Sequence, residues 1–132
     1  MSDYVIDAAA AVSALARADA IGIAADKRIT ESTCHAPHLL DAEVGQVLRR
    51  GERRGEITDE TARTALRALT NMIDYRYPHD RLADLAWGLR HTISFYDGLY
   101  VALATILGVP LLTGDVKLSK APGLTCAVEV LC

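Results

Sequence analysis

Residues 96–115 read YDGLYVALATILGVPLLTGD. The part Tyr96–Leu107 is mostly apolar and predicts a buried helix that ends at Gly108. The part Val109–Thr113 predicts a buried strand. A buried helix that leads directly into a buried strand is typical of a parallel sheet with helices on both faces.

The flanking sequence continues this alternation of helices and strands. In Leu39–Arg54, apolar residues at i, i+4, i+7 and i+8 predict an amphipathic helix. We expect residues 18–34 to form a helix and a loop, and 35–37 to be a break, because proline disfavours helix in the residue before it. The other expected helices are Ala8–Arg17, about 59–72, Asp80–Leu89 and Lys117–Lys120, and the other expected strands are Tyr4–Ile6, Asp74–Tyr77 and Ala127–Leu131. Together they predict an α/β fold.

Length and composition predict one folded domain over residues 1–132, with 51% apolar and 23% charged residues. The net charge of −3 argues against a bulk electrostatic binder of nucleic acid, although a local arginine patch is still compatible with one. The longest uncharged apolar run, Leu99–Leu112, has 14 residues, whereas a membrane helix needs about 20. The chain has an odd number of cysteines, Cys34, Cys126 and Cys132, which favours reduced thiols over disulfides. The start of the chain lacks the basic region of a signal peptide. We therefore expect a cytoplasmic protein.

Four acidic residues occupy positions that solubility does not explain. Asp7 and Asp115 follow predicted strands, and open parallel sheets bind ligands at the carboxyl ends of their strands. Glu43 and Asp97 lie on the apolar faces of their predicted helices. Alternative interpretations are that Asp7 and Asp97 cap helices and that Asp115 is a turn residue. A purely structural role is hardest to assign to Glu43, because a carboxylate on an apolar face needs a partner and that face has no basic residue.

If the four segments meet, these carboxylates form a cation site. Two carboxylates about 4 Å apart repel by about 4 kcal/mol at an effective dielectric constant of 20. Either their pKa values rise or a cation joins them. Oxygen ligands suit Mg²⁺ or Mn²⁺, which can activate water for in-line displacement at phosphorus.

The chain resembles a PIN-domain ribonuclease, specifically the VapC toxins of bacterial VapBC toxin–antitoxin pairs. The resemblance spans nearly the whole chain, and its specificity comes from the order and spacing of individually weak motifs. These motifs are VIDA (5–8), HLLDAEV (38–44), LRH (89–91), YDGLYVALA (96–104), LLTGD (111–115) and APG (121–123).

The resemblance implies a PIN-like three-layer α/β/α sandwich with a central, mainly parallel sheet. It maps the metal-binding acids of the family onto the same four residues, Asp7, Glu43, Asp97 and Asp115. It implies Mg²⁺-dependent cleavage of RNA, with Mn²⁺ able to substitute, leaving 5′-phosphate and 3′-hydroxyl ends. It also implies a VapB-type antitoxin that covers the active site, and toxin homodimers within that complex, with no role for a membrane.

One position departs from the family pattern. Members usually carry Ser or Thr two residues after the first Asp, where this chain has Ala9. Thr113 still provides a hydroxyl beside Asp115. The departure supports one alternative function, a catalytically degenerate PIN domain that only binds its antitoxin or RNA.

Arginines supply candidate contacts to RNA or to an acidic partner. Four of them fall within six positions, and another precedes the Asp97 helix beside His91. They are Arg49, Arg50, Arg53, Arg54 and Arg90. The alternatives are a solvated helix end for the cluster and structural hydrogen bonding for Arg90.

Other functions find less support in the sequence. A haloacid-dehalogenase-type phosphatase needs Asp at position 9, and a P-loop, a G-x-G-x-x-G loop and the adjacent acids of a receiver domain are absent. Cys34, His35 and His38 lack a second cluster with zinc-like spacing. We expect the single tryptophan, Trp87, to lie in the core; the alternative is a platform on which bases stack.

Overall fold

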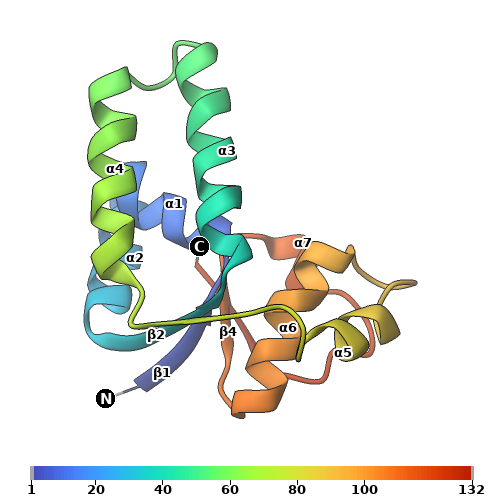
Figure 1. The fold of residues 1–132 in the computed structure, drawn as a ribbon. Helices are drawn as coiled ribbons and strands as arrows, with labels where there is room; N and C mark the ends of the chain where they lie inside the picture. Colours follow the sequence, from blue (N-terminus) through green and yellow to red (C-terminus); the bar gives the residue numbers. More distant parts are fainter. Residues whose placement is uncertain (1, 132) are drawn as a thin grey trace.

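The computed structural model describes residues 2–131, and these form one five-stranded, all-parallel sheet in the order β3-β2-β1-β4-β5 (Figure 1). The strands are β1 (Ser2–Ile6), β2 (Ser32–Pro37), β3 (Tyr75–Tyr77), β4 (Leu111–Thr113) and β5 (Val128–Val130). In β1, Val5 is in register with His35 of β2 and Leu111 of β4, so β1 lies at the centre of the sheet. The predicted α/β class is confirmed.

Helices cover both faces of this sheet (Figure 1). They are α1 (Ala8–Ala16), α2 (Ala20–Thr30), α3 (Leu39–Arg53), α4 (Asp59–Met72), α5 (Ala83–Gly88), α6 (Phe95–Leu107) and α7 (Val116–Ser119). The first four pack together on one side, and α5 and α6 pack on the other. From β1 to β3 the chain adds strands on one side of β1, and after β3 it returns to add β4 and β5 on the other side. Because crossovers between parallel strands are right-handed, this change of direction places the later helices on the opposite face of the sheet. Among residues 2–131, no single helix is long and apolar enough to cross a membrane. Only α1 and α2 taken together reach that length and composition, and their axes are bent by 111° relative to each other.

Local signals predicted most of these elements. Gly108 ends α6 in the left-handed conformation, with φ 68°. Thr58 caps α4 by accepting a hydrogen bond from the Thr61 amide at 3.1 Å. The predicted helix over Asp80–Leu89 is shorter in the structure, where α5 begins at Ala83.

The expectation of a break at residues 35–37 was wrong. These residues belong to β2, which pairs with β1 and β3 inside the sheet. The segment STCHAP has neither alternating polarity nor a run of strong strand formers, so its local signal for a strand is weak. Proline ends the strand, as Pro37 is its last residue.

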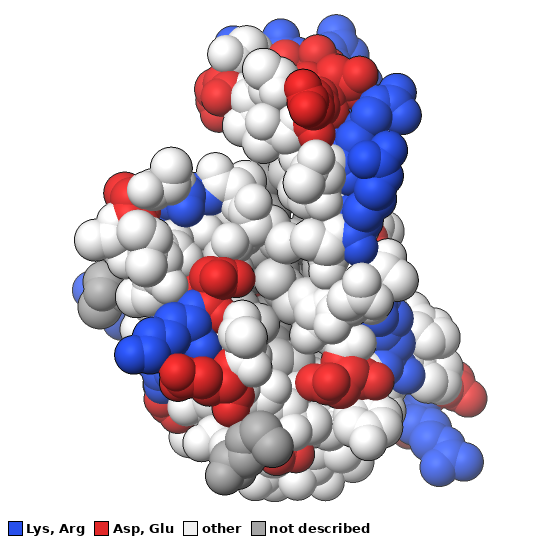
Figure 2. Space-filling view, turned by 90° about the vertical axis from the view of Figure 1, so that its left-hand side faces the viewer, with Lys and Arg blue, Asp and Glu red and all other residues white. Residues whose placement is uncertain are grey.

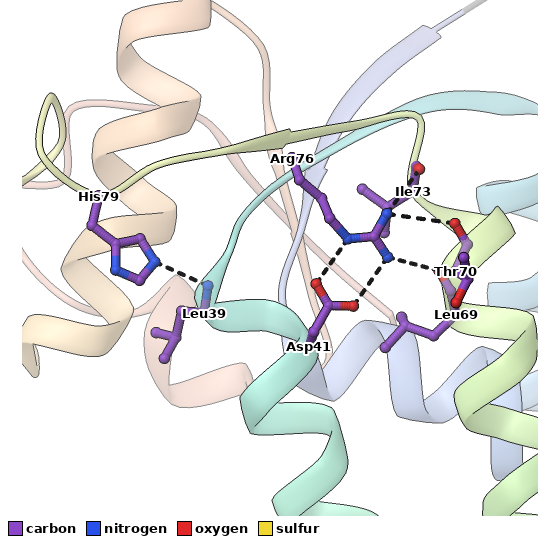
Figure 3. Close-up of polar contacts among 7 residues, drawn as sticks. All are labelled: Leu39, Asp41, Leu69, Thr70, Ile73, Arg76 and His79. Carbon is purple, nitrogen blue, oxygen red and sulfur yellow. Dashed lines mark hydrogen bonds and ion pairs between the residues drawn. The ribbon is translucent and has the colours of Figure 1, made fainter.

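The segment that follows α4 ties α3 to the rest of the fold (Figure 3). Arg76 of β3 donates two hydrogen bonds to the Asp41 carboxylate, at 2.8 and 3.0 Å. The same guanidinium donates to carbonyl oxygens at the end of α4, including that of Leu69 at 3.0 Å. The Leu39 amide donates to Nε2 of His79 at 2.9 Å. These contacts hold the first turns of α3, which carry Glu43.

Candidate active site

The topology of the sheet brings the four acidic residues to one edge. Strand order reverses between β1 and β4, and ligands of open α/β sheets bind outside the carboxyl ends of the strands at such a point. Asp7 directly follows β1, and Asp115 comes two residues after β4. Because crossover helices run antiparallel to the strands, α3 and α6 begin at this same edge and carry Glu43 and Asp97 in their first two turns.

Asp7 is the most buried of the four carboxylates, with 6% of its surface exposed. Its Oδ1 accepts a hydrogen bond from the Ala10 amide at 2.9 Å, and its Oδ2 accepts one from the Thr113 hydroxyl. Burial raises the pKa of Asp7 to about 6, and the charge of Asp97 adds to that increase. Asp7 therefore caps α1, as the alternative interpretation held, and also faces a second carboxylate.

Asp97 does not cap its helix, so that alternative interpretation was wrong. The N-cap of α6 is Ser94, whose hydroxyl accepts from the Asp97 amide at 3.0 Å. Burial raises the pKa of the Asp97 carboxyl, and the charge of Asp115 raises it further. Asp115 caps α7, with Oδ1 accepting from the Lys117 amide at 2.9 Å.

Glu43 has an uncharged partner that the sequence pattern did not predict. The Tyr100 hydroxyl donates to Oε1 of Glu43 at 2.6 Å. Tyr100 is 1% exposed, and burial, followed by the interaction with Glu43, raises its pKa so that it stays a donor. The charges of Asp7 and Asp97 also act on Tyr100. A signal was present, since Tyr100 lies three residues after Asp97 and so on the same face of the helix.

Thr113 connects the two acids that follow strands. Its hydroxyl is fully buried, donates to Asp7 and accepts from the Asp115 amide at 2.9 Å. Ala9 lies beside this link, because a Cβ added to Gly114 would lie 3.0 Å from the Ala9 Cβ. The position that lacks the usual hydroxyl therefore packs directly against the loop that carries Asp115.

The chemistry of these donors fits a hard divalent cation. All four side chains offer carboxylate oxygens, the ligands preferred by Mg²⁺ and Mn²⁺. The charge of Asp97 helps to raise the pKa of Asp7, and the charge of Asp115 helps to raise the pKa of Asp97. In this conformation, no three His, Cys, Asp or Glu side chains of residues 2–131 are grouped closely enough to hold a metal ion.

The arginine cluster on α3 divides between two faces of the helix. Arg50 lines an open cleft of about 400 Å³ together with Glu43 and Tyr96. Arg49 instead lines a depression between α3 and α4. All four arginines of the cluster are exposed, and none forms an ion pair within residues 2–131. Figure 2 shows basic side chains along the α3–α4 hairpin and acidic ones near its tip.

The prediction that Trp87 lies in the core was wrong. Its side chain is 60% exposed, because α5 turns its neighbour Ala86 toward the core. The Arg90 guanidinium lies 4.8 Å from the centre of the Trp87 ring and donates to the Trp87 carbonyl oxygen at 3.0 Å. Arg90 thus has the structural hydrogen bond that its alternative interpretation invoked, while its side chain stays exposed.

The zinc candidates have separate surroundings. The Cys34 thiol is buried and donates to the Ile29 carbonyl oxygen at 3.4 Å, and burial raises its pKa to about 12. His35 lies between Asp3 and Tyr77, with ring nitrogens 3.0 and 2.7 Å from their oxygens. Cys34 and Cys126 are free thiols, and Cys132 lies outside the described residues.

Comparison with known proteins identifies the family of this chain. The family model of the PIN domain matches residues 4–124. Ribonuclease VapC1 of Mycobacterium tuberculosis is 54% identical over 132 residues, covering 99% of each chain, and Ribonuclease VapC9 of the same organism is 35% identical over 127 residues, covering 96% of this chain and 97% of VapC9. A crystal structure of DNA-bound VapBC from Salmonella typhimurium superimposes with a TM-score of 0.69 over all of both chains at 13% identity, which shows the shared fold. The chain therefore belongs to the PIN-domain family, and within it to the VapC group.

Proposed function

We propose that this protein is an Mg²⁺-dependent endoribonuclease that acts as the toxin of a toxin–antitoxin pair. The observation that carries the proposal is the position of four acids at one edge of the sheet, where strand order reverses, with the pKa values of Asp7 and Asp97 raised. Relatives named as ribonucleases support RNA as the substrate.

Each acid has a role that follows from its surroundings. Asp7, Asp97 and Asp115 would hold the cation, and Thr113 keeps Asp7 and the Asp115 backbone in place. Bound Mg²⁺ supplies a Lewis acid that stabilises charge on the phosphate and activates water. Glu43 would ligate the cation or orient the attacking water, because Tyr100 fixes one of its oxygens and the other has no hydrogen-bond partner among residues 2–131.

The toxin would act in the cytoplasm, where its RNA substrate is found, and would be restrained by a VapB-type antitoxin. Structures of VapBC with the same fold support that partner. Exposed arginines on α3 suit contact with RNA phosphates or with an acidic segment of the partner. A homodimer within the toxin–antitoxin complex is part of the proposal.

The test is cleavage of total cellular RNA by the antitoxin-free protein, with fragment ends sequenced. Mg²⁺ and Mn²⁺ are compared with EDTA, and the wild type with Asp97→Asn. We expect discrete cuts that require metal and disappear in the variant. Cuts that persist in Asp97→Asn would contradict the assigned site.

The alternative, a domain that only binds antitoxin or RNA, has Ala9 as its sole support. It predicts normal antitoxin binding and no cleavage by the wild type in either metal. Under that alternative, Ala9→Ser is the first change expected to restore activity, because position 9 packs against Gly114 beside Asp115.

A further inference from the structure

An aromatic side chain at the mouth of the candidate site has no role in the mechanism above. Tyr96 immediately precedes Asp97 in the first turn of α6, and 59% of its surface is exposed. Its hydroxyl has no hydrogen-bond partner among residues 2–131, whereas Tyr100 on the same helix is buried and bonded to Glu43. The Tyr96 ring is thus held beside the acids with its surface open to solvent.

The cleft beside Tyr96 is built from one face of α3. Its walls include Leu39, Glu43, Gln46, Val47 and Arg50, which follow helical spacing. Its volume of about 400 Å³ lies within the usual range for sites that bind small organic groups. Apolar walls with one amide and one guanidinium suit a flat, polar-edged ring that is attached to an anionic group.

The charges along this cleft run in a definite order. Glu43, at one end, belongs to the candidate metal site. Arg50 lies seven residues further along α3, about 10 Å away at 1.5 Å per residue. Neighbouring phosphates of an extended single strand lie closer together than this separation. The length of the Arg50 side chain makes up the difference. A phosphate at the acids and the next one at Arg50 would place the intervening base beside Tyr96.

We propose that this cleft binds one unpaired nucleobase next to the scissile phosphate, with Tyr96 stacking on the base, Gln46 facing its edge and Arg50 contacting the next phosphate. The inference rests on the proposed ribonuclease function and adds a base-binding subsite beside the scissile phosphate. Bases are free to stack on aromatic side chains only where the RNA is unpaired.

The test measures binding without cleavage. Full-length protein in EDTA is titrated with two labelled probes, an octamer of adenosine nucleotides and an octamer of abasic ribose phosphates. Alanine substitution of a stacking residue typically lowers affinity by about 5- to 150-fold per base. We therefore expect Tyr96→Ala to weaken binding of the adenosine octamer by that factor and to leave the abasic octamer unaffected, whereas Tyr96→Phe binds both as the wild type does. Arg50→Ala should weaken both probes.

Tyr75→Ala is the matched control, since Tyr75 is 56% exposed and lies on β3 outside the cleft. Equal losses for Tyr75→Ala and Tyr96→Ala would overturn the inference. Unchanged octamer binding by Tyr96→Ala would also overturn it, and a weaker antitoxin complex in that variant would assign the cleft to the antitoxin. If the wild type cleaves RNA in Mg²⁺ while the stacking test fails, only the base subsite is refuted. If the wild type neither cleaves RNA nor binds either octamer, the proposed function fails as well.

Discussion

At the scale of single residues, Asp7 combines a buried environment with an ionisable group. Its hydrogen bonds to Ala10 and Thr113 favour the charged form, but the loss of solvation outweighs them and the pKa rises to about 6. Such a carboxylate lowers the stability of the metal-free protein at neutral pH and favours a bound cation. This trade between stability and function is common at active sites.

This balance predicts a pH-dependent effect of Asp7→Asn. Because the folded-state pKa is raised from 3.8 to about 6, the stability associated with protonated Asp7 is fully present below pH 3.8 and is lost as the pH rises through 6. Relative to the wild type in EDTA, Asp7→Asn should gain about 2 to 3 kcal/mol of unfolding free energy between pH 4 and pH 7.5. Urea unfolding at several pH values measures this difference. Asp26→Asn, at an exposed position of α2, is the control, and a constant difference between Asp7→Asn and wild type would contradict the prediction.

Tyr100→Phe tests whether the orientation of Glu43 matters. Phenylalanine keeps the shape of the buried ring but removes the hydroxyl that donates to Glu43 at 2.6 Å. We expect a stability loss of about 1 kcal/mol in urea unfolding and a fall of about tenfold or more in the rate of RNA cleavage in Mg²⁺. Tyr77→Phe also removes a hydroxyl hydrogen bond, to His35, and should leave cleavage unchanged. An unaltered cleavage rate in Tyr100→Phe would remove Tyr100 from the site.

At the scale of elements, the position of α3 depends on a few polar contacts from β3 and the residues after it. Arg76 joins Asp41 near the start of α3 to the last carbonyl groups of α4, and His79 accepts from the first amide of α3 (Figure 3). Helix ends leave such backbone groups without partners inside the helix. Glu43 and Arg50 both lie on α3. These contacts therefore fix the positions of two residues of the candidate site, although Arg76 and His79 are not part of that site.

Arg76→Ala should therefore destabilise the fold more than loss of a surface ion pair does. It removes two bonds to a carboxylate and one at 3.0 Å to the Leu69 carbonyl, so we expect a loss of about 2 to 3 kcal/mol in urea unfolding. Arg76→Lys should recover less than half, because lysine lacks the forked donor geometry. Arg63→Ala breaks an exposed pair with Asp59 and should cost under about 0.5 kcal/mol. Similar losses for Arg63→Ala and Arg76→Ala would refute the special role of this contact.

At the scale of the whole molecule, the candidate metal site joins segments that are distant in the chain. A cation held between the ends of β1 and β4 and the starts of α3 and α6 would bind only the folded state. Metal binding and global stability are therefore linked.

Mg²⁺ should accordingly raise the thermal unfolding temperature of the wild type in a concentration-dependent way. At 100 times the dissociation constant, the gain is about 2.7 kcal/mol. Asp97→Asn should lose most of this gain, and matched ionic strength from NaCl should not reproduce it. The same Mg²⁺-dependent shift in wild type and Asp97→Asn would show that the ion binds elsewhere.

Much of the fold follows from local sequence signals. The spacing of apolar residues in α3 and the apolar run of α6 need no tertiary information, because helical periodicity and caps such as Thr58 and Gly108 act within a few residues. The acids could be singled out for the same reason. Asp7 and Asp115 follow strand-forming runs, and Glu43 and Asp97 interrupt apolar faces.

Only the tertiary structure decided the remaining features. β2 forms because β1 and β3 supply its hydrogen-bond partners on both sides, which its own residues do not reveal. The bond between Tyr100 and Glu43 joins residues 57 positions apart, and the exposure of Trp87 depends on how α5 packs against α6. Sequence pattern therefore determined most of the elements and which acids are unusual. Contacts between distant segments determined the formation of β2 and the partners and burial of those side chains, because desolvation and hydrogen bonding depend on neighbours that the chain brings together only on folding.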